Sequence, residues 1–106
     1  MYIIISTTTD NKSVADSIAK KVLDLNLSPC VQIYPDIESS YIWDKKINSS
    51  KEFIIQIKTI DKNIDFIANI IKDIHNYNVP EIISYKINLH NAEYEKWFII
   101  NSQGKE

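Results

Sequence analysis

The chain has 106 residues, 44% of them hydrophobic, and a formal net charge of −2, which is the size and composition of one globular domain. The weak charge predicts no affinity for nucleic acid or for an anionic membrane. All 12 basic residues are lysine and the only glycine is Gly104, so neither an arginine fork nor a glycine-rich loop is available to hold a phosphate group.

Strand-like and helix-like patterns follow one another along the chain. The predicted elements are, in order, a strand over 2–8, a helix over about 12–26, a strand over 30–43, a strand over 53–59, a helix over about 62–75, a strand over 82–87 and a helix over 92–100. Asp10 or Asn11 is expected to cap the first helix, and Asp61 the second.

The segment from residue 30 to 59 predicts a long hairpin. Pro35 and Asp36 mark a bend or bulge in its first strand, because strand-like residues continue beyond them. Residues 44–46 are expected to form the turn, and the polar residues 47–51 follow it. Large apolar residues gather near the tip: Ile37, Tyr41, Ile42 and Trp43. One small domain cannot cover both faces of such a hairpin, so we expect oligomerisation.

The order βαββαβ followed by a helix is that of the split βαβ, ferredoxin-like α+β fold. We expect it to occupy residues 1–106 as one domain, with a frayed tail over 102–106. Cys30 is the only cysteine, which excludes an internal disulfide. The first residues lack the basic lead of a signal peptide, and no apolar run reaches the roughly 20 residues of a membrane-spanning helix, so we expect a cytoplasmic location.

The stretch over 75–83, between the second long helix and the last strand, gathers an imidazole, a phenol and a carboxylate from His75, Tyr77 and Glu81. Pro80 stiffens the stretch and favours an extended Val79. This composition is typical of a recognition loop.

Together with three further segments, this loop makes the chain resemble the CutA divalent-cation-tolerance family along nearly its whole length. The segments are Cys30-Val31-Gln32-Ile33, Tyr41-Ile42-Trp43 and Ile57-Lys58-Thr59. The resemblance implies a ferredoxin-like trimer, in which hairpins pair around a three-fold axis, and a role in the response to metal ions.

His75 and Glu81 are the candidate metal ligands. A neutral imidazole binds copper or zinc, and the carboxylate of Glu81 would add a hard oxygen ligand or act as a general base. The alternatives are a histidine that interacts with the last carbonyls of a helix, and a loop carboxylate bonded to backbone amides. Ser6 and Ile74 stand where related bacterial proteins can carry soft ligands, so the resemblance implies weak binding of copper(II) or another divalent cation.

Trp43 and Tyr77 are expected to line a ligand cleft between subunits, where the hairpin tip of one chain meets the 75–83 loop of another. Lys58, which faces the same region in related proteins, would hold an anion there, and Cys30 would supply a soft ligand. The alternatives are interface packing for the two aromatic residues, a solvated strand end for Lys58 and a small buried hydrophobe for Cys30.

Several activities share this architecture, because a fold does not determine function. A hydrolase of the acylphosphatase type would need an arginine-bearing phosphate loop, and the chain has no arginine. An RNA-recognition module would need several exposed aromatic residues in a basic frame on the strand over 53–57, which has one aromatic residue and no such frame. We therefore expect a trimeric binding protein and no enzyme, with a divalent metal ion or a small ligand at the inter-subunit cleft. The alternatives are a small-ligand-sensing regulatory trimer without a physiological metal and, less favoured by the residues, a small hydrolase of the acylphosphatase type.

Overall fold

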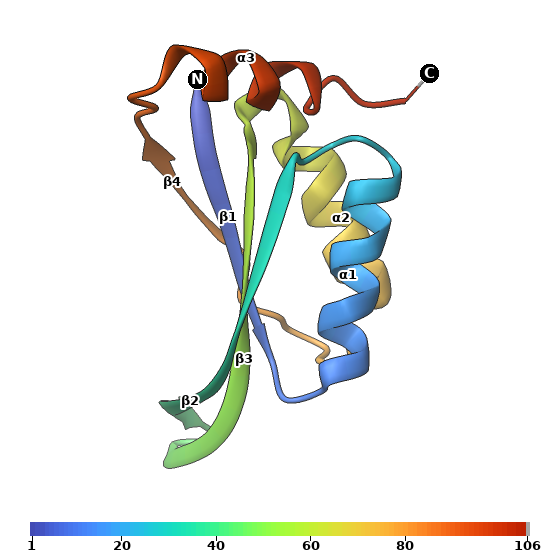
Figure 1. The fold of residues 1–106 in the computed structure, drawn as a ribbon. Helices are drawn as coiled ribbons and strands as arrows, with labels where there is room; N and C mark the ends of the chain where they lie inside the picture. Colours follow the sequence, from blue (N-terminus) through green and yellow to red (C-terminus); the bar gives the residue numbers. More distant parts are fainter. Residues whose placement is uncertain (106) are drawn as a thin grey trace.

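The computed structural model describes residues 1–105 and has the predicted element order (Figure 1). Its elements are β1 (Tyr2–Thr9), α1 (Lys12–Asp24), β2 (Cys30–Trp43), β3 (Lys46–Ile60), the 3-10 turn η1 (Asp61–Asn63), α2 (Ile64–Ile74), β4 (Ile83–Ile87) and α3 (Ala92–Ile100). The α+β fold with the order βαββαβ and a final helix is therefore confirmed. Within residues 1–105, every helix is too short or too polar to cross a membrane.

The four strands form one antiparallel sheet in the order β2-β3-β1-β4. Helices α1 and α2 lie side by side on one face of this sheet, and α3 lies across its end, next to the N-terminus (Figure 1). The opposite face carries no helix among the described residues, as expected for a two-layer arrangement.

The core lies between the sheet and the two long helices. Ile5 and Ile57 are directly opposite each other in β1 and β3 and point to the same face, because side chains alternate along strands. They pack with the apolar sides of both helices in one cluster, which includes Ile18, Val22, Ile67 and Ile71. Each fully buried isoleucine contributes about 1.5–3 kcal/mol relative to an exposed one, so this cluster fixes the position of the sheet against the helices.

The long hairpin is confirmed, with β2 and β3 paired from Cys30 and Lys58 to Trp43 and Lys46. The predicted bulge is present, since the register shifts after Tyr34 and resumes at residue 37. Asp36 has φ 57° there, a left-handed conformation that aspartate tolerates better than most residues.

Two predicted boundaries in the hairpin are wrong. The turn consists of Asp44 and Lys45 alone, with φ 53° and 62°, as in two-residue hairpins whose central residues both have positive φ. β3 begins at Lys46, not at Phe53. The residues 47–51, which are polar apart from Ile47, gave no apolar alternation because this arm packs against no core, and their pairing with β2 makes them a strand.

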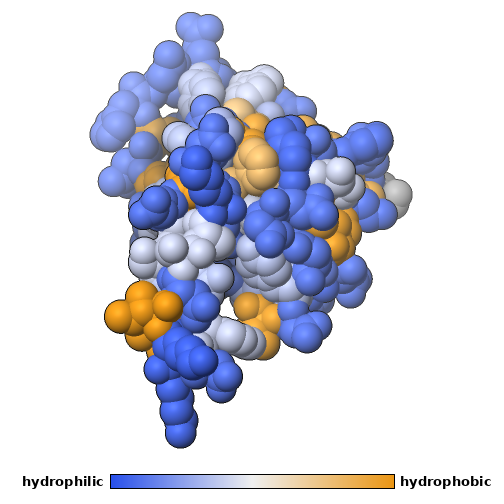
Figure 2. Space-filling model, turned by 90° about the horizontal axis from the view of Figure 1, so that it is seen from below, coloured by the Kyte–Doolittle hydropathy of each residue, from blue (hydrophilic) through white to orange (hydrophobic). Residues whose placement is uncertain are grey.

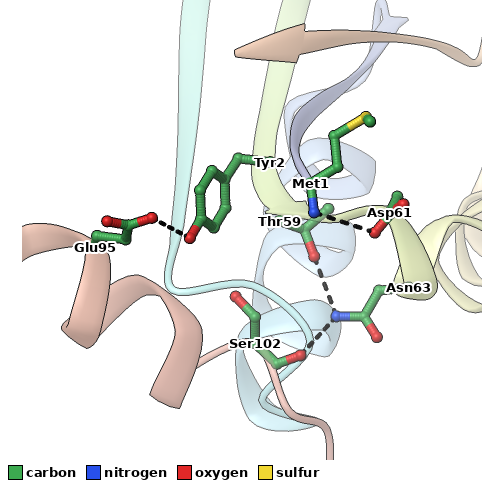
Figure 3. Close-up of polar contacts among 7 residues, drawn as sticks. All are labelled: Met1, Tyr2, Thr59, Asp61, Asn63, Glu95 and Ser102. Carbon is green, nitrogen blue, oxygen red and sulfur yellow. Dashed lines mark hydrogen bonds and ion pairs between the residues drawn. The ribbon is translucent and has the colours of Figure 1, made fainter. Parts of the chain in front are cut away.

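The predicted caps are correct for one helix and wrong for the other. Asn11 caps α1, and its Oδ1 accepts a hydrogen bond from the Val14 amide at 3.2 Å. Asp61 instead lies in the 3-10 turn, and no side chain caps α2. The Asp61 carboxylate faces the amino group of Met1 at 3.6 Å (Figure 3).

Asn63 joins three separate segments beneath this end of the sheet (Figure 3). Its Nδ2 donates to the carbonyl oxygens of Leu27 at 3.0 Å and Ser102 at 2.7 Å, and to the Thr59 hydroxyl at 3.1 Å. Ser102 is fully buried, and the Gly104 amide donates to the carbonyl of residue 26. The predicted fraying of 102–106 is therefore wrong for 102–104, which are tied to the fold by backbone groups, whereas residue 106 lies outside the described residues.

Candidate ligand-binding cleft

His75 begins the loop over 75–82 as the first non-helical residue after α2, with φ −61° and ψ 143°. Its Nε2 lies 2.8 Å from the Thr8 carbonyl oxygen, and its Nδ1 accepts a hydrogen bond from the Tyr77 amide at 3.0 Å. A carbonyl only accepts and an amide N–H only donates, so the proton of the neutral imidazole resides on Nε2. Both ring nitrogens are used within the chain, and a metal ion would have to displace one of these partners.

Tyr77 connects the same loop to the hairpin by a hydrogen bond. Its hydroxyl donates to Glu52 Oε2 at 2.6 Å, and its ring lies against the His75 ring with centroids 4.8 Å apart. Burial, followed by the hydrogen bond to Glu52 and the charge of that carboxylate, raises the pKa of Tyr77 well above its ordinary value. The phenol is therefore a protonated donor to Glu52 Oε2 at neutral pH.

Between the hairpin and the loop lies a cleft of about 630 Å³. Tyr41 and Trp43 of β2 line one side, and Tyr77 and Glu81 of the loop line the other. Glu52 of β3 contributes to the lining although only 7% of it is exposed. Among the described residues no lysine or histidine lines this cleft, so its ionisable lining is acidic.

The structure brings some of the predicted site residues together and separates others. Trp43, Tyr77 and Glu81 line the cleft, and His75 lies just behind it through its contacts with Thr8 and Tyr77. Cys30 and Lys58 are paired with each other in the register of β2 and β3. They lie six residues beyond Glu52 along β3, or roughly 20 Å at about 3.3 Å per residue, so a single chain does not place them in the cleft.

Glu52 is an ionisable cleft residue that the sequence did not indicate. It follows the polar residues 48–51 and looks like one more exposed position in that run. Its burial depends on Tyr77, which is 25 residues away in the chain, and no local pattern reports such a contact.

A metal site formed by one chain alone is incomplete. Within residues 1–105, no group of three or more histidine, cysteine, aspartate or glutamate side chains is close enough to hold a metal ion. Glu52 and Glu81 offer oxygen ligands in the cleft, which suit hard cations better than soft ones.

The sequence and the fold both match known proteins. The family model described as CutA1 divalent ion tolerance protein matches residues 3–101. The chain belongs to the CutA1 family. A chloroplastic CutA 1 protein of rice is 34% identical over 95 residues, which is 90% of this chain and 54% of the rice protein. The divalent-cation tolerance protein CutA of Thermus thermophilus is 30% identical over 99 residues, 93% of this chain and 96% of that protein.

Solved structures of CutA1 proteins share the whole fold. The divalent cation tolerance protein from Thermus thermophilus superposes with a TM-score of 0.91 at 30% identity, covering 96% of this chain and 99% of that one. The CutA1 structure from rice gives a TM-score of 0.91 at 31% identity, covering 96% of this chain and 94% of that one. The present chain spans about half the length of the rice and human relatives, 54% and 50%, so the family assignment applies to the region that they share.

Proposed function

We propose that this CutA1-family chain acts as a homotrimeric binding protein that takes a cation in the cleft between the hairpin and the loop over 75–82. The observation that carries the proposal is the acidic and aromatic lining of that cleft, formed by Glu52, Glu81, Trp43 and Tyr77 without a basic residue among those described. Such a lining favours a positively charged ligand and disfavours a phosphate or carboxylate compound.

The trimer is supported by the apolar surface of the hairpin arm. Ile42, Trp43 and Ile47 are 69%, 62% and 81% exposed, and they lie within a few residues of the turn. Figure 2 looks onto the end of the molecule that carries the turn and shows apolar groups standing among hydrophilic side chains. Exposed apolar side chains on an unpartnered hairpin favour association with further copies of the chain.

Light scattering at low micromolar concentration tests the assembly, and we expect the mass of three chains. Trp43→Ala should weaken the trimer, because a large aromatic residue at an interface can contribute about 2 kcal/mol or more. Lys72→Ala, on the exposed side of α2, serves as a matched surface control. A folded wild-type monomer would refute the proposed trimer.

For a divalent metal ion we propose weak binding through carboxylate oxygens, with His75 as a ligand only if its Nε2 leaves the Thr8 carbonyl. Calorimetric titration with copper(II) compares the wild type with Glu81→Gln and His75→Ala. We expect the larger loss of affinity in Glu81→Gln, because its carboxylate already lines the cleft. A larger loss in His75→Ala would show that the imidazole is the principal ligand and that the loop rearranges around the metal.

A ligand sensor without a physiological metal is the second candidate. It is favoured by the aromatic lining of the cleft, which contributes nothing to metal coordination, and by the incomplete set of metal ligands within residues 1–105. No catalytic role is proposed for any residue of the cleft.

We also propose a cytoplasmic location, which is compatible with Cys30 as a free thiol. The rice relative carries the word chloroplastic in its name, so the location of this chain needs a test of its own. Imaging of a fluorescent fusion in the source cell tests this proposal, and signal confined to another compartment would refute it.

A further inference from the structure

The buried carboxylate of Glu52 forms no ion pair with any residue of the described range 1–105. Its only hydrogen-bond partner among the described residues is the neutral hydroxyl of Tyr77. The ion pairs within residues 1–105 join Met1 to Asp61, Lys12 to Asp16 and Lys20 to Asp24. A buried charge is normally paired, because removing it from water is costly without compensation.

The hairpin itself offers no cation that could reach Glu52 from the same face. Lys51 precedes it, but consecutive side chains of a strand point to opposite faces, and Lys51 is exposed. The residue directly opposite Glu52 in β2 is Ile37, which is uncharged. A cation that enters the cleft would therefore supply the missing countercharge.

The side chains that line the cleft favour one chemical class of cation. Tyr41 and Trp43 present rings that are 44% and 62% exposed, and Tyr77 adds a third. Aromatic rings attract ammonium groups through their faces and bury apolar groups well. Ser39, which lies on the same face of β2 as Tyr41 and Trp43, and Glu81 also line the cleft, and their side-chain oxygens can accept N–H donors.

We propose that the ligand of this cleft is a primary ammonium compound with a flat or apolar body, whose ammonium group pairs with Glu52 while its body packs against Trp43 and Tyr41. The three N–H donors of a primary ammonium can bond to side-chain oxygens of the lining, and the aromatic rings can contact its body, which metal coordination would leave unused. The volume of about 630 Å³ is within the range of roughly 300–1,000 Å³ typical of small-molecule sites. This assignment rests on the proposed function, since it names the cation of the same cleft.

Calorimetry with 2-phenylethylamine as the probe tests the assignment. Two compounds of the same shape serve as comparisons: 2-phenylethanol, which is neutral, and 3-phenylpropanoate, which is negatively charged. We expect the amine to bind and both comparison compounds to bind at least tenfold more weakly, the usual effect of losing a charge-assisted hydrogen bond. Equal binding of the alcohol, or no binding of the amine, would overturn the assignment.

Two substitutions locate the ammonium group. Glu52→Gln keeps the size of the side chain and removes its charge, so we expect at least tenfold weaker amine binding. Glu38→Gln is the matched control, because it removes an exposed carboxylate from the same hairpin outside the cleft, and it should bind as the wild type does. If Glu52→Gln does not fold by circular dichroism, Trp43→Leu carries the test through loss of the ring. Unchanged amine affinity in the folded variant that is tested would refute the assignment.

Measurements of mass, copper(II) binding and amine binding on one preparation distinguish a failure of this inference from a failure of the proposed function. A trimer that binds copper(II) but not 2-phenylethylamine contradicts the ammonium assignment and leaves the cation-binding trimer in place. A monomer that binds neither copper(II) nor the amine contradicts both.

Discussion

Replacing Asn63 with alanine should destabilise the fold more than any exposed substitution on α2. Asn63 is 3% exposed and its Nδ2 donates to Leu27, Thr59 and Ser102. The Leu27 carbonyl would keep the hydrogen bond that it receives from the Thr59 hydroxyl at 2.6 Å, whereas the carbonyl of Ser102 would lose its donor. An unsatisfied buried carbonyl costs about 1–3 kcal/mol, and the space vacated by the amide adds to this. We expect a total loss of about 2–4 kcal/mol.

Urea denaturation at one fixed protein concentration measures this loss, since the proposed self-association would make apparent stability depend on concentration. In calorimetry the midpoint should fall by about 10 °C or more for a domain of this size. Gln103→Ala is the control, because its side chain is exposed and its hydrogen-bond partners within residues 1–105 are Lys62 and the Ile99 carbonyl. The change in its free energy of unfolding should stay within about 0.5 kcal/mol. A loss below about 1 kcal/mol for Asn63→Ala would refute the role assigned to the three hydrogen bonds.

Two further substitutions test buried polar groups. Thr7→Val should stabilise the protein by about 1 kcal/mol, because the Thr7 hydroxyl is buried without a hydrogen-bond partner within residues 1–105; a measured destabilisation in urea would indicate a partner for that hydroxyl. Tyr77→Phe should be less stable than the wild type at neutral pH and lose less stability above pH 10. The folded-state pKa of Tyr77 is raised, so its contribution is present below the ordinary phenol pKa of about 10 and is lost as the unfolded chain ionises above it. Parallel stability curves of Tyr77→Phe and wild type between neutral pH and pH 11 would contradict this linkage.

The parts of the fold that depend on neighbouring residues could be predicted from the sequence. The bulge at Asp36 follows a proline within a strand pattern, and the cap at Asn11 directly precedes a helical period, so each has a local cause. The arm over 46–52 could not be predicted from apolar alternation, because its strand conformation comes from pairing with β2 and not from a buried face.

The candidate site was predicted in part for the same reason. The loop composition indicated Tyr77 and Glu81, but the partners of the loop are distant in the chain. The His75 imidazole meets the backbone of Thr8, 67 residues away, and the Tyr77 hydroxyl meets Glu52, 25 residues away. The sequence therefore indicated some of the side chains at the cleft, Trp43, Tyr77 and Glu81. It indicated neither Glu52 nor the hydrogen bonds that occupy both nitrogens of the His75 imidazole.

The two halves of β3 belong to different parts of the structure. From Phe53 to Ile60 the strand pairs with β1, and over residues 54–58 with β2 as well, whereas from Lys46 to Glu52 it pairs with β2 alone. A two-stranded ribbon is at best marginally stable by itself. In an isolated chain, the backbone amides of the arm would therefore exchange with solvent through local opening, whereas those of 53–60 would exchange only when the whole domain unfolds. Hydrogen exchange along this single strand would thus separate the folding of the domain from the ordering of its arm. Protection that extends into the arm is what the proposed trimer predicts, because contacts with another chain would suppress the local opening.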